Sequence, residues 1–323
     1  MLNVRMYFVA MGFWCLGCLP LTAMAQANNW PTRPVKMVVP FAVGGATDIA
    51  ARIIAPALGE ILGQQFIVEI KAGAAGNIAI ESVALSPPDG YTLLLGLAAP
   101  QTLSQHLGKI DYDGVKDFAP ITLINTNPLV LLVNPGLPIN SVADLIKYAK
   151  ANPGKLNFSG AGGLTQFAGE IFKARAGINM VHVPYRGGAP AVTAAVAGET
   201  QLTFANYSDA IPWIESGKLR PLAVTSASRF VLAPKIPAIS ETLPGYAVDG
   251  WSGLFAPVGT PPEIVNRLAA IVRDGFKDPA LRKRMESIGA IPGGDTPEEF
   301  RAFVRAESVK WGNFVAQTGI KGD

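Results

Sequence analysis

Cysteine and histidine are scarce in this chain of 323 residues. There are two cysteines, Cys15 and Cys18, and two histidines, His106 and His182. Both cysteines fall in a segment that we expect to be removed, so the mature chain has no thiol for a disulfide, a nucleophile or a metal site. The histidines lie far apart without a His-Glu-x-x-His pattern, so we expect no metal site and interpret them as loop and core residues.

The first 25 residues have almost no charge. Arg5 is their only charged side chain, residues 6–21 form an apolar run interrupted by Pro20, and residues 23–25 (Ala-Met-Ala) have the small-x-small pattern of a cleavage site. This predicts an export signal cleaved after Ala25 and a mature protein in the periplasm. The alternative is an uncleaved membrane anchor, but the run is shorter than the ~20 residues that span a bilayer.

Charge is also low over the whole chain, at 16% of residues, while 49% are hydrophobic. That balance excludes intrinsic disorder and predicts a large buried core. The 27 basic and 24 acidic residues are interspersed, so no basic face for nucleic acid is expected. No repeat of fixed period occurs, which excludes a solenoid, and the length suggests two domains.

The mature chain opens with a β-α-β pattern. Residues 36–41 predict a buried strand, and a helix with apolar spacing follows Gly44-Gly45 and ends at Gly63. Residues 65–70 predict the next strand, so the sheet should be at least partly parallel. Either Thr47 or Asp48 is expected to cap the helix at its N-terminus.

The same order recurs about 115 residues later. A strand over 156–159 leads into the glycine loop 160–163 and a helix that begins at Thr165. A capped helix is also predicted after Thr260 and after Thr296, and the apolar stripe of the last helix should pack against a core. The further predicted strands span 91–97, 121–125, 129–134 (starting a second group after Pro128), 201–205 and 221–225, and the further predicted helices span 141–151, 189–197 and 208–216.

Several catalytic and nucleotide-binding patterns are absent. The chain has no Gly-x-Ser-x-Gly elbow, no Ser-x-x-Lys and no glycine loop that ends in Gly-Lys-Ser/Thr. The loop 160–165 has threonine where the dinucleotide fingerprint needs its last glycine, and no acid stands near position 180. A hydrolase is therefore disfavoured, and no cofactor is expected.

What remains is a pair of glycine loops that each lead into a helix N-terminus. There the free backbone N–H groups and the helix dipole favour an anion, so Gly44-Gly45 and Gly160 to Gly163 are expected to clamp a small carboxylate. The hydroxyls of Thr47, Ser159 and Thr165 would add donors.

Two of these assignments have a simpler alternative. Asp48 either orients its loop or accepts a hydrogen bond from a ligand amine, but Asp48 and Thr165 are also expected in these places as ordinary helix caps. The segment 185–188, which begins at Tyr185, is a candidate third ligand loop, although Arg186 fits a solvated position equally well.

Several motifs together resemble the Bug or TctC-like extracytoplasmic solute receptors of tripartite tricarboxylate transporters, over nearly the whole mature chain. They are Pro40-Phe41-x-x-Gly44-Gly45-x-x-Asp48, Gly76-Asn77-Ile78, 88–93 (Pro-Asp-Gly-Tyr-Thr-Leu), 183–188 (Val-Pro-Tyr-Arg-Gly-Gly), 222–226 (Leu-Ala-Val-Thr-Ser) and Phe255-Ala256-Pro257-x-Gly259-Thr260-Pro261.

The resemblance implies an α/β, two-lobed periplasmic binding protein of the type II-like kind, with its ligand cleft between the lobes. It implies one lobe from 26–125 with 228–323 and a second from 126–227. It further implies a small organic carboxylate held by backbone amides, hydroxyls and waters, permease subunits as membrane partners, and a monomer without a cofactor.

The family's cleft-lining segments correspond here to 98–102 and 206–209, from which Gln101, Thr102 and Asn206 are expected at the site, with Phe41 as a wall of the pocket. The chain departs from the family at Thr165-Gln166, where a histidine often follows the second glycine loop. Ala74-Ala75 and Ala79 replace glycines near Asn77. The identity of the ligand therefore does not transfer.

Two other functional classes stay open from the sequence. One is a periplasmic enzyme acting on a small carboxylate, disfavoured by the missing catalytic motifs. The other is a ligand sensor without transport, which needs the same cleft and so has the same sequence features.

Overall fold

The structure is a computed structural model that describes residues 29–41, 43–160, 162–185 and 187–319. The predicted export signal, residues 1–25, lies outside the described residues, and so does Arg186. The chain divides into two compact units, 1–30 and 31–323, and the account below concerns the second.

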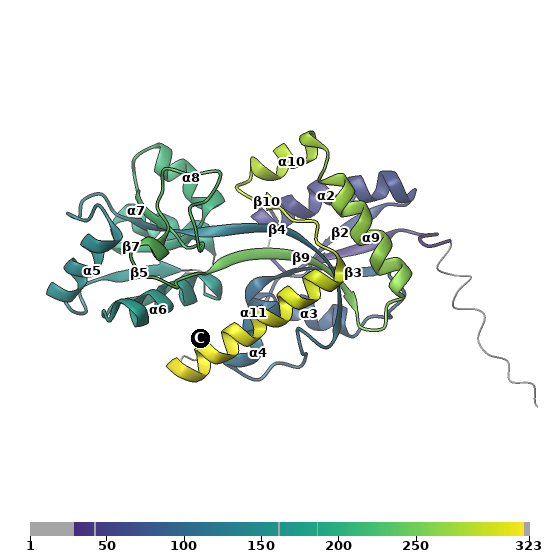
Figure 1. Ribbon diagram of the computed structural model, residues 1–323, viewed down its shortest axis with the longest axis horizontal. Coiled ribbons are helices and arrows are strands. Elements are labelled where there is room, and N and C mark those ends of the chain that lie inside the picture. Colours follow the sequence, from purple (N-terminus) through teal and green to yellow (C-terminus); the bar gives the residue numbers. More distant parts are fainter. Residues whose placement is uncertain (1–28, 42, 161, 186, 320–323) are drawn as a thin grey trace, which may run out of the picture. The chain divides into compact units, whose positions relative to one another are not determined.

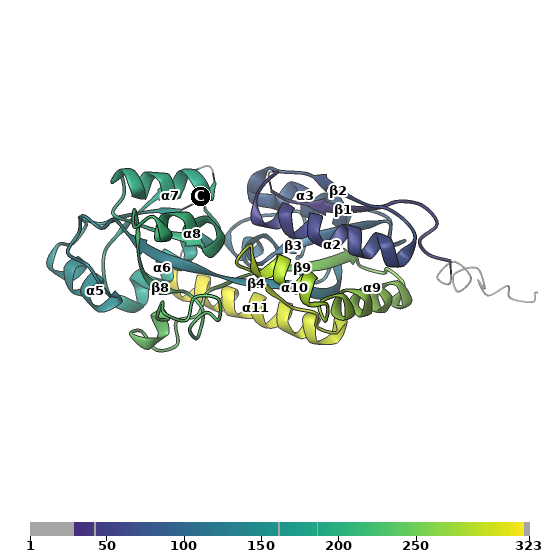
Figure 2. The ribbon, with the colours of Figure 1, turned by 90° about the horizontal axis from the view of Figure 1, so that it is seen from above.

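The first section of the sheet has the strand order β2-β1-β3-β9-β4 (Figures 1 and 2). Strand β1 is parallel to both β2 and β3, whereas β9 is antiparallel to β3 and β4, and the short β10 pairs with β4. These strands are β1 (Val35–Val39), β2 (Phe66–Ile70), β3 (Thr92–Leu97), β4 (Phe118–Val133), β9 (Asp249–Pro257) and β10 (Ile291–Pro292).

The second section is built on the continuation of β4. There β4 pairs antiparallel with β7 (Leu202–Asn206) and β8 (Arg220–Val224). Strand β5 (Asn157–Gly160) lies between β7 and β6 (Val181–Pro184) and is parallel to both. The β-α alternation predicted from the sequence is therefore confirmed, with parallel strands in both sections.

Strand β4 corrects the prediction of two strand groups separated at Pro128. The strand runs through Pro128 without a break, and its partner changes there: β9 pairs with it up to Pro128, while β7 and β8 pair with it from Leu129 and Val130 onward. A proline is tolerated at such a changeover because its missing N–H interrupts neither ladder in its middle.

Helices cover both faces of each section (Figures 1 and 2). In the first, α2 packs with α9 and α10, and α3 and α11 contact other parts of the same strands. In the second, α7 and α8 pack together over β4, β5 and β7, and α6 contacts β5, β6 and β7. The helices are α2 (Ala46–Leu62), α3 (Asn77–Ala84), α4 (Ser104–Leu107), α5 (Val142–Ala151), α6 (Leu164–Ala176), α7 (Gly188–Ala197), α8 (Tyr207–Glu215), α9 (Pro262–Gly275), α10 (Pro279–Glu286) and α11 (Pro297–Thr318), with the short turns η1 (Ala74–Gly76), η2 (Ala99–Leu103) and η3 (Ile239–Glu241).

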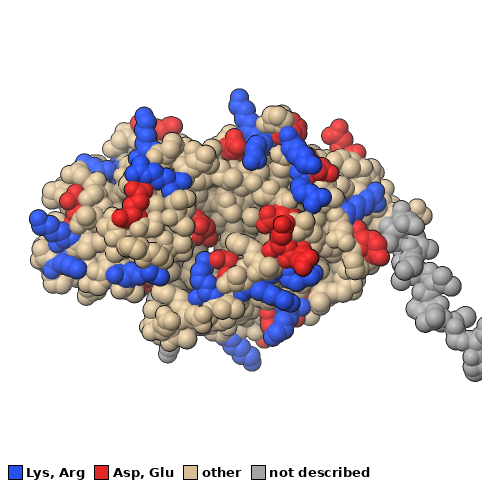
Figure 3. All heavy atoms as spheres, viewed as in Figure 1, with Lys and Arg blue, Asp and Glu red and all other residues tan. Residues whose placement is uncertain are grey.

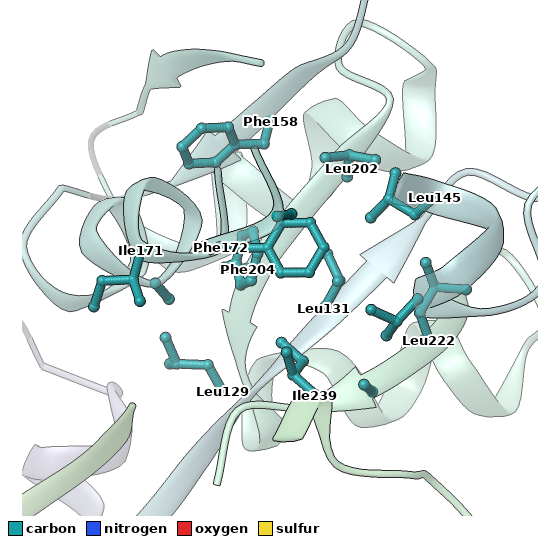
Figure 4. Packing of buried hydrophobic residues seen from close by; sticks show 14 of the residues in the cluster. Leu129, Leu131, Leu145, Phe158, Ile171, Phe172, Leu202, Phe204, Leu222 and Ile239 are labelled. Carbon is teal, nitrogen blue, oxygen red and sulfur yellow. The ribbon is translucent and has the colours of Figure 1, made fainter. Parts of the chain in front are cut away.

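The end of β4 shows how one strand serves two cores. Leu129, Leu131 and Val133 belong to the cluster that includes Phe158 and Phe172, drawn in Figure 4. Val130 and Leu132 belong to a different cluster, formed with α7 and α8. Because side chains alternate across a strand, an unbroken apolar run indicates burial on both faces, and all five of these side chains are fully buried.

Helix α11 carries the predicted apolar stripe, and its packing is confirmed. Phe300 and Val304 lie in the cluster of the first sheet section, while Trp311 lies in the cluster around Phe158. The capping box predicted at Thr296 is also confirmed, since its Oγ1 accepts from the N–H of Glu299 and its own N–H donates to Glu299 Oε2.

The similar pattern at Thr260 does not form a cap. The Thr260 hydroxyl donates to the carbonyl of Pro257 at 2.8 Å, and α9 has Pro261 in its N-cap position. The second proline moves the start of the helix by one residue, because its fixed φ suits the first helical position.

Candidate functional site

The predicted ligand residues lie at the carboxyl ends of parallel strands. Phe41 to Asp48 follow β1, Gln101 and Thr102 follow β3, and Ser159 to Thr165 span the end of β5 and the start of α6. Tyr185 follows β6 and Asn206 ends β7. In an open α/β sheet this edge is where ligands bind, so the topology gathers the twelve predicted residues on one such edge in each section.

The loop after β1 is closed by Asp48 from inside the helix. Gly45 is the N-cap of α2 and has no side-chain cap, so the prediction of Thr47 or Asp48 as N-cap is wrong. Asp48 Oδ2 accepts from the N–H of Gly44 at 2.9 Å, and Oδ1 accepts from Nε of Arg52 at 2.8 Å. Asp48 is 2% exposed, so its charge is buried where the helix dipole favours an anion.

Phe41 stands against a strained turn. Its ring lies 3.3 Å from where a methyl group on Gly76 would sit, and it is 40% exposed. The turn runs from Gly73 to Gly76 with positive φ throughout, and Ala74 (φ 46) and Ala75 (φ 53) adopt that region without being glycine. Such strain often marks functional sites. Only the family resemblance pointed to this turn, since nothing local indicates positive φ at an alanine.

Gln101 and Thr102 are fully buried and hydrogen-bonded within the protein. Gln101 Nε2 donates to the carbonyl of Gly114, and Thr102 Oγ1 donates to the carbonyl of Ala98 at 2.7 Å. The hydroxyl of Tyr112 lies 2.7 Å from the carbonyl of Pro100. These contacts fix the turn after β3, so the buried side chains of Gln101 and Thr102 support the carboxyl edge of the sheet from the protein interior.

The loop after β5 is built differently from the loop after β1. Gly163 is the N-cap of α6 without a side-chain cap, and the first turn of α6 has no acidic residue. Gly162 (φ 77) and Gly163 (φ 52) take conformations that favour glycine, and Thr165 Oγ1 donates to the carbonyl of Gly162 at 3.0 Å. The positive end of the dipole of the thirteen-residue helix α6 therefore lies at the carboxyl edge of the sheet, and no acidic residue in the first turn of α6 compensates it.

Gly160 allows this loop to lie close to its neighbours. A methyl group on Gly160 would lie 3.0 Å from both Thr165 Oγ1 and His182 Nε2. His182 lies in β6, with its ring 5.0 Å from that of Phe158, so it borders the loop. His106, expected in a loop, lies in α4 instead, with Nε2 3.1 Å from Ser308 Oγ on α11.

Ser159 is fully buried beneath the same loop. Its Oγ donates to the carbonyl of Ala191 at 2.7 Å and accepts from Oγ1 of Thr200 at 3.1 Å. Thr203 donates to its carbonyl at 3.0 Å. The hydroxyl thus ties β5 to α7.

Beyond this loop, the ends of β6 and β7 bring one further acid to the edge. Tyr185 donates to Glu199 at 3.1 Å, and Asn206 Nδ2 donates to Asp209 Oδ2 at 3.2 Å. A methyl group on Gly188, the first residue of α7, would lie 2.5 Å from Asp209 Oδ2. Burial raises the pKa of Asp209, and the hydrogen bond from Asn206 opposes that shift. The family resemblance placed the segment 206–209 at the cleft, but the prediction named only Asn206 from it, because the burial of a single acid such as Asp209 has no local pattern.

Other surfaces do not share these features. A hollow of about 840 Å³ lies beside the outer strand β2 and α2, and none of the residues that line it was predicted for the site. Its one charged lining residue, Arg52, is the partner of Asp48. Figure 3 shows basic and acidic side chains interspersed over one face. In the described part of the chain, no three His, Cys, Asp or Glu residues are grouped to hold a metal ion, and no helix has the length and hydropathy to cross a membrane.

Glycine loops and helix N-termini at the carboxyl edges of parallel strands define the class: an α/β ligand-binding protein. The chain belongs to the tripartite tricarboxylate transporter family of receptors, whose TctC model matches residues 50–320. It is similar to the protein BugT of Bordetella pertussis, with 34% identity over 306 residues that cover 93% of this chain and 94% of that protein.

Solved structures agree with this family. A protein of R. palustris solved with adipate is 38% identical with a TM-score of 0.83, covering 90% of this chain and 99% of that one. MatC from Rhodopseudomonas palustris with bound malate is 31% identical with a TM-score of 0.79, covering 88% and 100%. BugD, a periplasmic binding protein, is 32% identical with the same TM-score, covering 91% and 100%. The predicted family and the predicted two-lobed α/β fold are confirmed.

Proposed function

We propose that this protein is a periplasmic receptor that captures a small organic carboxylate for a transporter of the tripartite tricarboxylate type. The observation that carries the proposal is the N-terminus of α6, which has a glycine N-cap, no acid in its first turn and a position at the carboxyl end of β5. Backbone N–H groups and the dipole at such a terminus favour an anion. The adipate and malate bound to two relatives are carboxylates of this kind.

In this proposal the backbone of Gly160 to Thr165 binds the carboxylate group. Phe41 and the loop of Gly44, Gly45 and Thr47 form the opposite wall, with Asp48 holding that loop in place. Gln101, Thr102 and Ser159 fix the loops from beneath, because Gln101 Nε2 and the hydroxyls of Thr102 and Ser159 bond within the protein. Tyr185 and Asn206 belong to the rim.

The wider setting follows from the family. Removal of residues 1–25 would release the mature chain into the periplasm, where it would act as a monomer and deliver its ligand to permease subunits. Lobes of 26–125 with 228–323 and of 126–227 would close on the ligand without chemical change.

Ligand-dependent melting tests this function. A ligand that binds only the folded state stabilises it by about 2.7 kcal/mol at a hundredfold excess over Kd. We expect this stabilisation to appear as a rise in Tm with at least one of adipate, malate or succinate. We expect no rise in Tm with the matching diamide or with sugars. The absence of any shift over a carboxylate panel, with protein dialysed free of retained ligand, contradicts a receptor. Turnover of a bound acid by the purified protein contradicts the non-catalytic role.

A further inference from the structure

The carboxylate of Asp209 is half-buried, and the described residues around it provide few of the hydrogen bonds or opposite charges that would offset the cost of burying it. Among the described residues, its one hydrogen bond is the 3.2 Å contact from Asn206 Nδ2. Burial is the main cause that raises the pKa of Asp209, and among the described residues the amide of Asn206 is the group that opposes this shift. A carboxylate in such a place has acceptor capacity left for a donor from outside the protein.

The position of Asp209 places that capacity at the proposed ligand edge. Asp209 is in the first turn of α8, which follows β7, and its Oδ2 approaches Gly188, which follows β6. Strand β5 lies between β6 and β7, so this contact passes beside the carboxyl end of β5, at the same edge where α6 begins.

A second polar group at this place has no partner among the described residues. The Oγ of Ser208, the neighbour of Asp209, is buried and makes no hydrogen bond to them. A methyl group on Gly289, in the loop before β10, would lie 3.4 Å from the N atom of Ser208, so the start of α8 is covered from that side. Buried polar atoms of this kind are uncommon, and they mark places where a ligand or ordered water supplies the missing bond.

The N-termini of α6 and α7 therefore offer opposite chemistry at the same edge of the sheet. The N-terminus of α7 already has the Asp209 carboxylate beside its first residue, whereas α6 has no acid in its first turn. A ligand carboxylate is favoured at α6 and repelled near Asp209, where a hydroxyl or an ammonium group is favoured instead.

We propose that Asp209 is a specificity residue that selects carboxylates with an adjacent hydrogen-bond donor, such as 2-hydroxy or 2-amino acids, over the plain acids of the same length. This inference rests on the proposed carboxylate receptor. It adds that the preferred ligand has two polar groups of opposite kind within reach of α6 and α8.

Matched ligands provide the test. Malate and aspartate each differ from succinate by one donor group, as 2-hydroxyglutarate and glutamate differ from glutarate. We expect calorimetric titration of the dialysed protein to show at least one donor-bearing acid binding about ten- to a hundredfold more tightly than its plain partner. Asp209→Asn should reduce that ratio to less than about threefold, because the charge-assisted bond and the repulsion of the plain acid are lost together.

Two further variants separate recognition from a structural role. Asp274→Asn removes an equal charge from an exposed ion pair with Lys277 and should leave the ratio unchanged. Gly188→Ala keeps Asp209 but places a methyl group against its carboxylate, so the ratio should fall without loss of folding. Each variant is also melted, since a structural role alone would change Tm and not the ratio.

The outcomes distinguish this inference from the proposed function. If plain acids bind as tightly as their donor-bearing partners, or if Asp209→Asn leaves the ratio intact, the selectivity assigned to Asp209 is wrong and the receptor stands. If no carboxylate binds at all, both are wrong.

Discussion

The units β1-α2 and β5-α6 share a sequence pattern and differ in their charge. Both have a glycine N-cap without a side-chain cap, and both follow a parallel strand. The third residue of α2 is Asp48, which closes its own loop, and the third residue of α6 is the uncharged Gln166. One residue in the first turn thus decides whether the dipole of each helix is compensated from within.

This difference teaches that two similar glycine loops need not be two similar anion sites. A symmetric clamp on one carboxylate, as expected from the sequence, requires both helix termini to be available. Asp48 places a fixed negative charge at α2, so the site proposed here is asymmetric: α6 anchors the carboxylate and the α2 loop shapes the wall.

The largest expected effect on ligand affinity comes from introducing an acid into α6 at the helical position that Asp48 has in α2. Gln166→Asp places a carboxylate in the same helical position, where two like charges about 4 Å apart repel by about 4 kcal/mol at an effective dielectric of 20. We expect a loss of carboxylate affinity of a hundredfold or more by calorimetry. Gln166→Asn, the uncharged isostere, serves as the control and should bind within about tenfold of the parent. Equal loss in both variants would remove charge as the cause.

The reverse change, Asp48→Asn, should affect folding more than binding. Asp48 holds the Gly44 N–H and Arg52 while buried, so its loss should lower the free energy of unfolding by about 1–3 kcal/mol in a denaturant titration. Carboxylate affinity should stay within about threefold. A large drop in the affinity of the folded variant would restore the symmetric clamp. Arg52→Gln, at a half-exposed position, should cost less stability than Asp48→Asn.

A smaller effect is expected at Thr165, which supports the α6 loop. Thr165→Val removes the hydroxyl that donates to Gly162, so we expect about 1 kcal/mol less stability and roughly three- to tenfold weaker binding. Thr193→Val removes a similar hydroxyl bond, to the carbonyl of Ala189 on the exposed face of α7, and should leave affinity unchanged. Equal affinities for these two variants would show that the Thr165 bond does not support the site.

The smallest effect concerns the strained turn beside Phe41. Ala74→Gly and Ala75→Gly should each stabilise the fold by about 0.5–1 kcal/mol, because glycine adopts positive φ without steric cost. Ala79→Gly, inside α3, should instead destabilise by about 1 kcal/mol. Chemical denaturation measures all three. A destabilised Ala75→Gly would mean that the turn is not strained.

Local chemistry carried much of the fold prediction. The stop of α2 at Gly63 and of α7 at Gly198 depends on glycine's left-handed conformation, and the capping box at Thr296 depends on residues three apart. Such features are visible in a short window of sequence. The strand through Pro128 was not, because its continuity comes from pairing with β9, more than a hundred residues away.

The candidate site divides in the same way. The sequence pointed to the glycine loops and to Asp48, but it left three roles open for Asp48, and its bonds to Gly44 and Arg52 support the one in which it orients its loop. The burial of Ser159 and Gln101 depends on side chains brought in by β7, α7 and the turn at Gly114. The approach of Asp209 to Gly188 likewise depends on strand order, which no local pattern encodes.

A crystal structure of the protein with its carboxylate ligand tests the asymmetric site most directly. The account predicts a ligand carboxylate oxygen within about 3.2 Å of a backbone N atom in the first turn of α6, residues 164–166, and none within that distance of the backbone N atoms of residues 46–48. A ligand carboxylate bound at residues 46–48, with the terminus of α6 left to water, would contradict it.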